Sequence, residues 1–74
     1  MRDHKIRFQR YEVSLRGDVI RTFNKKNRAL AIAFATDYSI TNATSAVIVD
    51  AVSSKGSNGQ TTTCVGAFIN GEKV

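Results

Sequence analysis

Alternating polar and apolar residues mark the first regular element of the chain. Between residues 10 and 16, Tyr11, Val13 and Leu15 fall on one face, and polar or charged residues fall on the other. This period of two predicts a strand with one buried face. The tripeptide Arg16-Gly17-Asp18 follows it and predicts a hairpin turn.

Two positions upstream break the alternation. Ile6 and Phe8 lie in the opposite phase to the buried positions of the strand. A slip of one residue moves side chains to the other face of a sheet. Either the strand is therefore bulged near Gln9 and Arg10, or these two side chains cover a second surface.

The segment from Val19 to Phe23 can return as the second strand of the hairpin. Its inward face is ambiguous, because the buried positions could be Ile20 and Thr22, or else Val19, Arg21 and Phe23. We expect the face with Phe23 to be buried.

An alanine-rich segment, Arg28 to Tyr38, predicts a helix. Asn24 or Asn27 can cap it, since a short side-chain oxygen can accept from the unpaired amides of the first turn. Cations in this first turn lie at the positive end of the helix dipole, which suggests a site that favours an anion.

The predicted helix has two apolar stripes, although a one-layer protein needs only one. The first is Ala29, Ile32, Ala33 and Thr36, which suits the sheet, and the second is Leu30, Phe34 and Tyr38, with Ala31 and Ala35 beside it. Two interpretations stay open. The second stripe forms the edge of the core, or it is an interface for a partner or a homodimer.

The C-terminal half predicts two more strands. The segment from Ala46 to Val52 is apolar and β-branched, and Thr61 to Asn70 ends at the turn pair Asn70-Gly71. Cys64 alternates with Val65 in the last strand, so we expect its thiol to be buried. The predicted fold is α+β: one domain over residues 1–74, arranged ββαββ, with an antiparallel sheet and one helix packed on one face.

Charge is distributed unevenly along these elements. The first 28 residues hold nine basic and three acidic residues, a net charge of +6, whereas the remainder sums to −1. Such a field attracts polyanions or acidic protein surfaces. The candidate binding residues are Arg7, Arg10, Arg16, Arg21, Lys25, Lys26 and Arg28, and we expect Arg10 and Arg16, with Glu12, on the open face of the sheet.

The composition excludes several functions. One cysteine and one histidine, Cys64 and His4, cannot close a zinc site or an internal disulfide. No nucleophile and base, or pair of carboxylates, has catalytic spacing, so we expect a non-enzymatic protein without metal or cofactor. The N-terminus lacks an apolar signal segment and the longest apolar stretch, Ala29 to Ala35, is too short to span a membrane, so we expect a cytoplasmic protein.

The segment Tyr11 to Ala33, YEVSLRGDVIRTFNKKNRALAIA, resembles small phage and mobile-element modules, including the arm-site DNA-binding domains of tyrosine integrases. The resemblance covers a strand, a glycine turn, a strand ending in Phe and an alanine-rich helix. It implies that the open face of the sheet contacts DNA. The residues it implies for the core are Tyr11, Val13, Phe23, Ala29, Ile32 and Ala33. Integrase modules have a strand before the hairpin and lack the two strands that follow Ala46 here.

Two functional hypotheses follow. The first is a small basic binding module, an accessory protein of a phage or mobile element that contacts nucleic acid or a nucleic-acid-associated complex. The alternative is a small inhibitor or adaptor that binds an acidic surface of a host protein, steered by the same charges and anchored by Leu30, Phe34 and Tyr38.

Overall fold

The computed structural model describes residues 6–55 and 59–74, with side chains over 9–53 and 59–74. It contains β1 (Ile6–Leu15), β2 (Asp18–Asn24), α1 (Arg28–Thr41), β3 (Val47–Lys55), β4 (Gln60–Ile69) and β5 (Glu72–Lys73). The five strands form one antiparallel sheet in the order β2-β1-β3-β4-β5, and α1 packs on one face. The predicted α+β fold is confirmed, with β5 added to the four expected strands.

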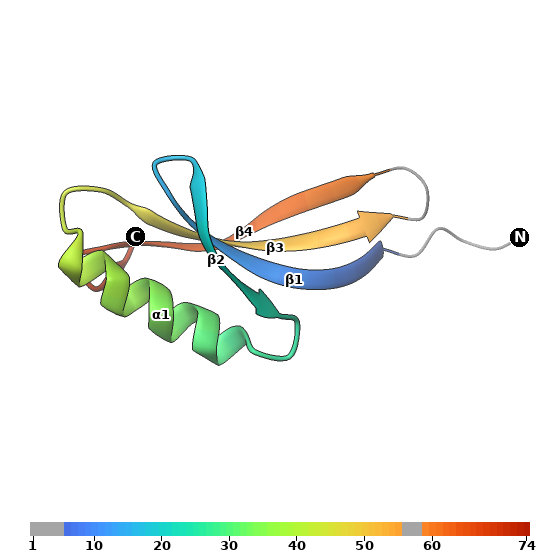
Figure 1. The fold of residues 1–74 in the computed structure, drawn as a ribbon, viewed down its shortest axis with the longest axis horizontal. Helices are drawn as coiled ribbons and strands as arrows, with labels where there is room; N and C mark the ends of the chain where they lie inside the picture. The colour runs from blue at the N-terminus through green and yellow to red at the C-terminus, as the bar shows by residue number, and fades with distance from the viewer. Residues whose placement is uncertain (1–5, 56–58) are drawn as a thin grey trace, which may run out of the picture.

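The helix covers only one end of the sheet. Figure 1 shows α1 along the end at which the chain terminates, while β1, β3 and β4 extend past its first turn. The core between the layers is small. It consists of Tyr11, Val13, Ala31, Ala35, Val47, Val49 and Phe68. Five of its members are valine or alanine residues with no exposed surface, so the two layers approach closely.

Bulges explain the phase breaks in the sequence. The register of β1 against β3 passes from Phe8 to Arg10, so the extra residue is Gln9, which agrees with the first of the two alternatives left open by the sequence. The register of β2 shifts in the same way and leaves Ile20 unpaired. As a result both Ile20 and Phe23 pack against the core, whereas Val19 is 51% exposed. The expected inward face of Val19, Arg21 and Phe23 is thus wrong in part: Phe23 is half-buried, but Val19 and Arg21 are exposed, and the bulge turns Ile20 inward in their place.

Two hairpins end in tight turns. Arg16 and Gly17 have φ values of 55° and 88°, and Asn70 and Gly71 have φ values of 51° and 83°. Paired positive φ angles match the twist of adjoining strands, which is why such turns favour glycine and asparagine. The second turn does not end the sheet as expected, because it returns the chain into β5.

The buried face of α1 differs from the expected one. Ala31, Ala35 and Ser39 are buried, whereas Ala29 and Ala33 are exposed, so the prediction that these last two face the sheet is wrong. The stripe of small side chains lets the helix lie close to the sheet. Ile32 and Thr36 from the expected stripe are half-buried along one flank of this contact.

A serine joins the end of the helix to the last hairpin. The Ser39 hydroxyl donates to the Thr36 carbonyl (2.7 Å) and accepts from the Gly71 amide (2.8 Å). At Gly71 the φ value is 83° and a Cβ would lie 2.9 Å from Cγ1 of Ile40, so any other residue would strain the turn and displace Ile40. These contacts join the C-terminal end of α1 to the turn between β4 and β5.

Candidate functional site

The sheet face opposite α1, here called the open face, carries Arg10, Glu12, Ser14, Ile48 and Asp50. These positions alternate with buried residues of β1 and β3. The open face is predicted to be basic, yet its charges cancel. Nη2 of Arg10 lies 2.9 Å from Oε2 of Glu12, and its Nε donates to the same oxygen at 3.0 Å. Arg10 is therefore already neutralised by its own strand.

A second carboxylate adds negative charge to this face. Asp50 on β3 lies directly opposite Glu12 on β1. Burial and the neighbouring Glu12 carboxylate raise the pKa of Asp50 above its ordinary value of 3.8. Like charges directly opposite one another in a sheet are unfavourable. Among the residues whose side chains are described, the open face thus holds one cation against two carboxyl groups, which does not favour a polyanion.

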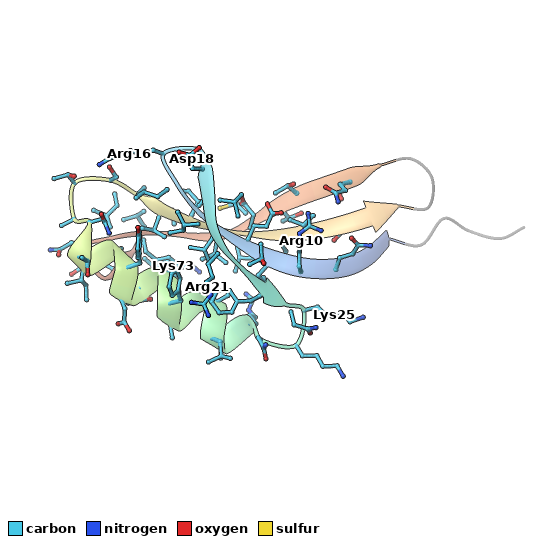
Figure 2. The ribbon with its side chains drawn as sticks, in the orientation of Figure 1. Arg10, Arg16, Asp18, Arg21, Lys25 and Lys73 are labelled. Carbon is cyan, nitrogen blue, oxygen red and sulfur yellow. The ribbon has the colours of Figure 1, made fainter. Side chains whose placement is uncertain are left out.

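Arg16 does not join Arg10 on the open face, contrary to the prediction. It lies in the β1–β2 turn, where its Nε donates to Oγ of Ser45 at 3.0 Å. Figure 2 shows Arg16 beside Asp18 at the tip of this hairpin, distant from Arg10. Because β1 ends at Leu15 and Arg16 belongs to the turn, the alternation of the strand does not determine which way its side chain points. The side chain of Arg7 lies outside the described residues.

The remaining candidate cations lie together, along the end of β2 and the start of α1. We call Arg21, Lys25, Lys26 and Arg28 the basic edge. In Figure 2, Arg21 lies between β2 and the helix and Lys25 lies at the turn that joins them. All four residues are exposed, and none forms an ion pair with a carboxylate of the described residues. Their charge is therefore available to a ligand.

The turn that carries these cations is built by two asparagines. Oδ1 of Asn24 accepts from the amide of Lys26 (2.9 Å), and the carbonyl of Asn24 accepts from the amide of Asn27 (2.9 Å). The sequence offers Asn24 or Asn27 as the capping residue of α1, and Asn27 is the N-cap residue. Its side chain makes no capping hydrogen bond. The N-cap side chain thus leaves the first-turn amides of the helix uncapped.

An aromatic row borders the basic edge. It consists of Phe23, Phe34 and Tyr38. The rings of Phe23 and Phe34 lie 5.7 Å apart and tilted, and those of Phe34 and Tyr38 lie 5.5 Å apart and stacked. The Arg21 guanidinium carbon lies 5.3 Å from the ring centroids of both Phe23 and Phe34. These contacts hold a cation on half-exposed aromatic faces.

The predicted interface of Leu30, Phe34 and Tyr38 divides into two parts. Phe34 and Tyr38 are half-buried and pack against the core, as the interpretation of a core edge requires. Leu30 is 58% exposed and stands apart from the core. The sequence did not reveal that Arg21 joins this row. The available signal was its position two residues before Phe23, on the same face of β2.

Other candidate groups contribute little to the site. Cys64 is exposed, contrary to the prediction, because the bulge at Val65 places it opposite Asp50 on the open face. His4 lies outside the described residues. Within residues 6–55 and 59–74, no three His, Cys, Asp or Glu side chains gather as a metal site. In that same part of the chain, no helix has the length and apolar character needed to cross a membrane.

Comparisons with protein-family models, curated proteins and solved structures find no significant match to this chain.

Proposed function

We propose that this protein is a non-enzymatic module that binds nucleic acid, with the basic edge as its contact surface. The observation that supports the proposal most is that Arg21, Lys25, Lys26 and Arg28 gather beside the aromatic row without a carboxylate partner among the described residues. Surface cations of this kind release counterions from a phosphate backbone when they bind it.

The aromatic row favours a flexible strand over a rigid duplex. Half-exposed rings and an arginine held against them offer faces on which an unpaired base can stack. A phosphate backbone bound at the β2–α1 turn would pass within reach of these rings. Phosphate contacts and stacking tolerate many sequences, so we expect weak sequence preference.

The test is binding of a fluorescent single-stranded oligonucleotide, followed by anisotropy at several salt concentrations. Lys25→Glu on the basic edge is compared with Lys73→Glu on β5, which changes the net charge equally at the other edge of the sheet. We expect Lys25→Glu to weaken binding roughly tenfold. The slope of log affinity against log salt concentration should fall by about one, the contribution of one phosphate contact. Lys73→Glu should change affinity less than about twofold.

Equal losses in the two variants would overturn the basic edge as the contact surface. No detectable binding of the oligonucleotide at low salt would overturn nucleic-acid binding itself and favour an acidic protein surface as the partner. An affinity that hardly depends on salt would overturn phosphate contact by the basic edge, because bound phosphates release counterions.

A further inference from the structure

Strand β4 borders the sheet over most of its length. One side of β4 pairs with β3 from Gln60 to Phe68, whereas the other side pairs with β5 only at Phe68 and Ile69. In the part of the chain that the structure describes, no strand lies along this second side between residues 60 and 66, here called the free edge. Figure 1 shows β4 extending away from the helix at the border of the sheet. The outward amides and carbonyls of the free edge are therefore open to another strand.

The free edge lacks the features that keep most sheet edges apart. Between Lys55 and Glu72 the chain has no charged residue and no proline, and the threonines from Thr61 to Thr63 are exposed. Charged side chains, prolines or a covering element protect most exposed edges. The opposite edge of the sheet, β2, carries the exposed Arg21 and borders the rest of the basic edge. Two copies of this chain, each with a net charge of +5, thus meet no repulsion from facing charges along the free edge.

Two neighbouring features define how far a second strand can pair. The register of β4 against β3 is continuous from Gln60 to Cys64 and then shifts at a bulge that adds Val65. Beyond the bulge, β5 occupies this side of β4, and the amide of Val74 donates to the carbonyl of Ala67 at 2.8 Å. Bulges end regular pairing, so the usable part of the free edge runs from Gln60 to Cys64.

We infer that the free edge pairs antiparallel with the free edge of a second copy of this chain, joining two sheets across a twofold axis. An axis at the middle of the usable part places Thr62 opposite Thr62 of the other copy. Thr61 then faces Thr63, and Gln60 faces Cys64. Every pair is uncharged, and Thr–Thr pairs across strands are favourable. The edge is thus complementary to itself, as a twofold interface requires.

This pairing leaves the basic edge uncovered, and the inference does not depend on nucleic-acid binding. The strands β1 and β3 separate β4 from β2, so the order across the dimer is β2-β1-β3-β4-β4-β3-β1-β2. Seven spacings of about 4.8 Å lie between the two β2 strands, which places the two basic edges about 34 Å apart along the sheet.

The first experiment is sedimentation of the purified, nuclease-treated full chain from about 10 µM to about 1 mM, because an interface of one strand pair is small. We expect a concentration-dependent dimer. Thr62→Lys and Thr62→Glu should each raise its dissociation constant at least tenfold, because like charges then face each other at the axis. An equimolar mixture of the two variants should form a heterodimer at least as stable as the wild-type dimer.

The matched controls are Thr22→Lys and Thr22→Glu, at an exposed threonine of β2 on the other edge of the sheet. They change the net charge of the chain by the same amounts as the Thr62 variants. Each should leave the dissociation constant within about twofold of the wild-type value. Circular dichroism checks that all four variants fold.

The second experiment locates the contact by amide hydrogen exchange, resolved by nuclear magnetic resonance. As the protein concentration rises from about 10 µM to about 1 mM, the outward amides between Gln60 and Cys64 should exchange at least fivefold more slowly, because they become hydrogen-bonded in the dimer. Exchange of the amides of β2, Asp18–Asn24, should not change.

Four outcomes would overturn the dimer: a monomer at every concentration, equal effects of the Thr62 and Thr22 variants, a mixture of Thr62→Lys and Thr62→Glu that associates no better than either alone, or slower exchange on β2 instead of β4. The proposed function fails separately. Oligonucleotide binding is measured on Thr62→Glu, which keeps the whole basic edge, and a loss of the dimer alone would leave that binding detectable.

Discussion

The open face and the basic edge both draw their cations from the first 28 residues, yet they differ in what they offer a ligand. On the open face Arg10 is paired with Glu12 and lies near Asp50, so its charge is used internally. On the basic edge the cations have no carboxylate partner among the described residues, and aromatic rings support one of them. Charge density along a chain therefore does not identify a binding surface until the pairing of each charge is known.

The test with the largest expected effect neutralises two cations of the basic edge and, for comparison, two cations outside it. Lys25→Gln with Arg28→Gln should weaken oligonucleotide binding about thirtyfold at low salt, because two phosphate contacts are lost. Arg10→Gln with Arg16→Gln removes the same charge from outside the basic edge and should weaken binding less than about threefold. Anisotropy titrations compare the two pairs, and similar losses would abolish the distinction between the regions.

Next in size is the effect of the aromatic row on stability. Phe34→Ala removes the ring that contacts Phe23, Tyr38 and Arg21, and should lower the free energy of unfolding by about 2–3 kcal/mol. Ile48→Ala, at a half-buried position of the open face, should cost about 1 kcal/mol. Urea denaturation measures both. A smaller loss for Phe34→Ala would mean that the row does not support the edge.

A smaller effect is expected from Asp50. Because its pKa is raised in the folded protein, the native state binds more protons than the unfolded chain between pH 3.8 and the raised value. Stability therefore falls as pH rises through this interval and stays lower above it. Asp50→Asn should remove this loss and raise the free energy of unfolding by about 0.5 kcal/mol at pH 7.

The matched control is Asp37→Asn, which removes one carboxylate from the exposed face of α1. Denaturation midpoints at pH 4 and pH 7 are compared for both variants and the wild type. If Asp50→Asn destabilised the protein at pH 7, the carboxylate would be engaged in a favourable contact, and the account of the open face would be wrong.

The smallest effect concerns the ion pair itself. Glu12→Gln removes the partner of Arg10, and exposed pairs contribute only about 0.2–1 kcal/mol, so stability should change little. The released cation should raise oligonucleotide affinity about twofold. An unchanged affinity, measured by anisotropy, would show that the open face lies outside the reach of the ligand even when its charge is free.

Local pattern was sufficient for most elements of this fold. Period-two alternation predicted the strand around Tyr11 and Val13, and the glycine turn after Leu15 predicted the hairpin. The break in phase before Arg10 left a bulge as one of two explanations, and the structure places that bulge at Gln9. These features depend on residues near one another in the chain, so sequence alone carries them.

The short strand β5 and the orientation of α1 could not be predicted in this way. A two-residue strand has no periodicity, and β5 exists because Asn70 and Gly71 reverse the chain beside β4. The helix has apolar residues on several sides. The face that is buried was selected by close packing of Ala31 and Ala35 on the sheet and by the hydrogen bond from Gly71 to Ser39.

The sequence by itself determined the element types, the turns and a basic N-terminal half, because these follow from local propensity and composition. Only the tertiary structure decided which cations are free. Glu12 neutralises Arg10 within one strand, the hairpin turn carries Arg16 away, and the packing of α1 against β2 brings Arg21 onto Phe23 and Phe34. The contacts of Arg16 with Ser45 and of Arg21 with Phe34 join distant residues, so no periodicity in the chain records them, whereas the Arg10–Glu12 pair joins neighbours on one face of a strand.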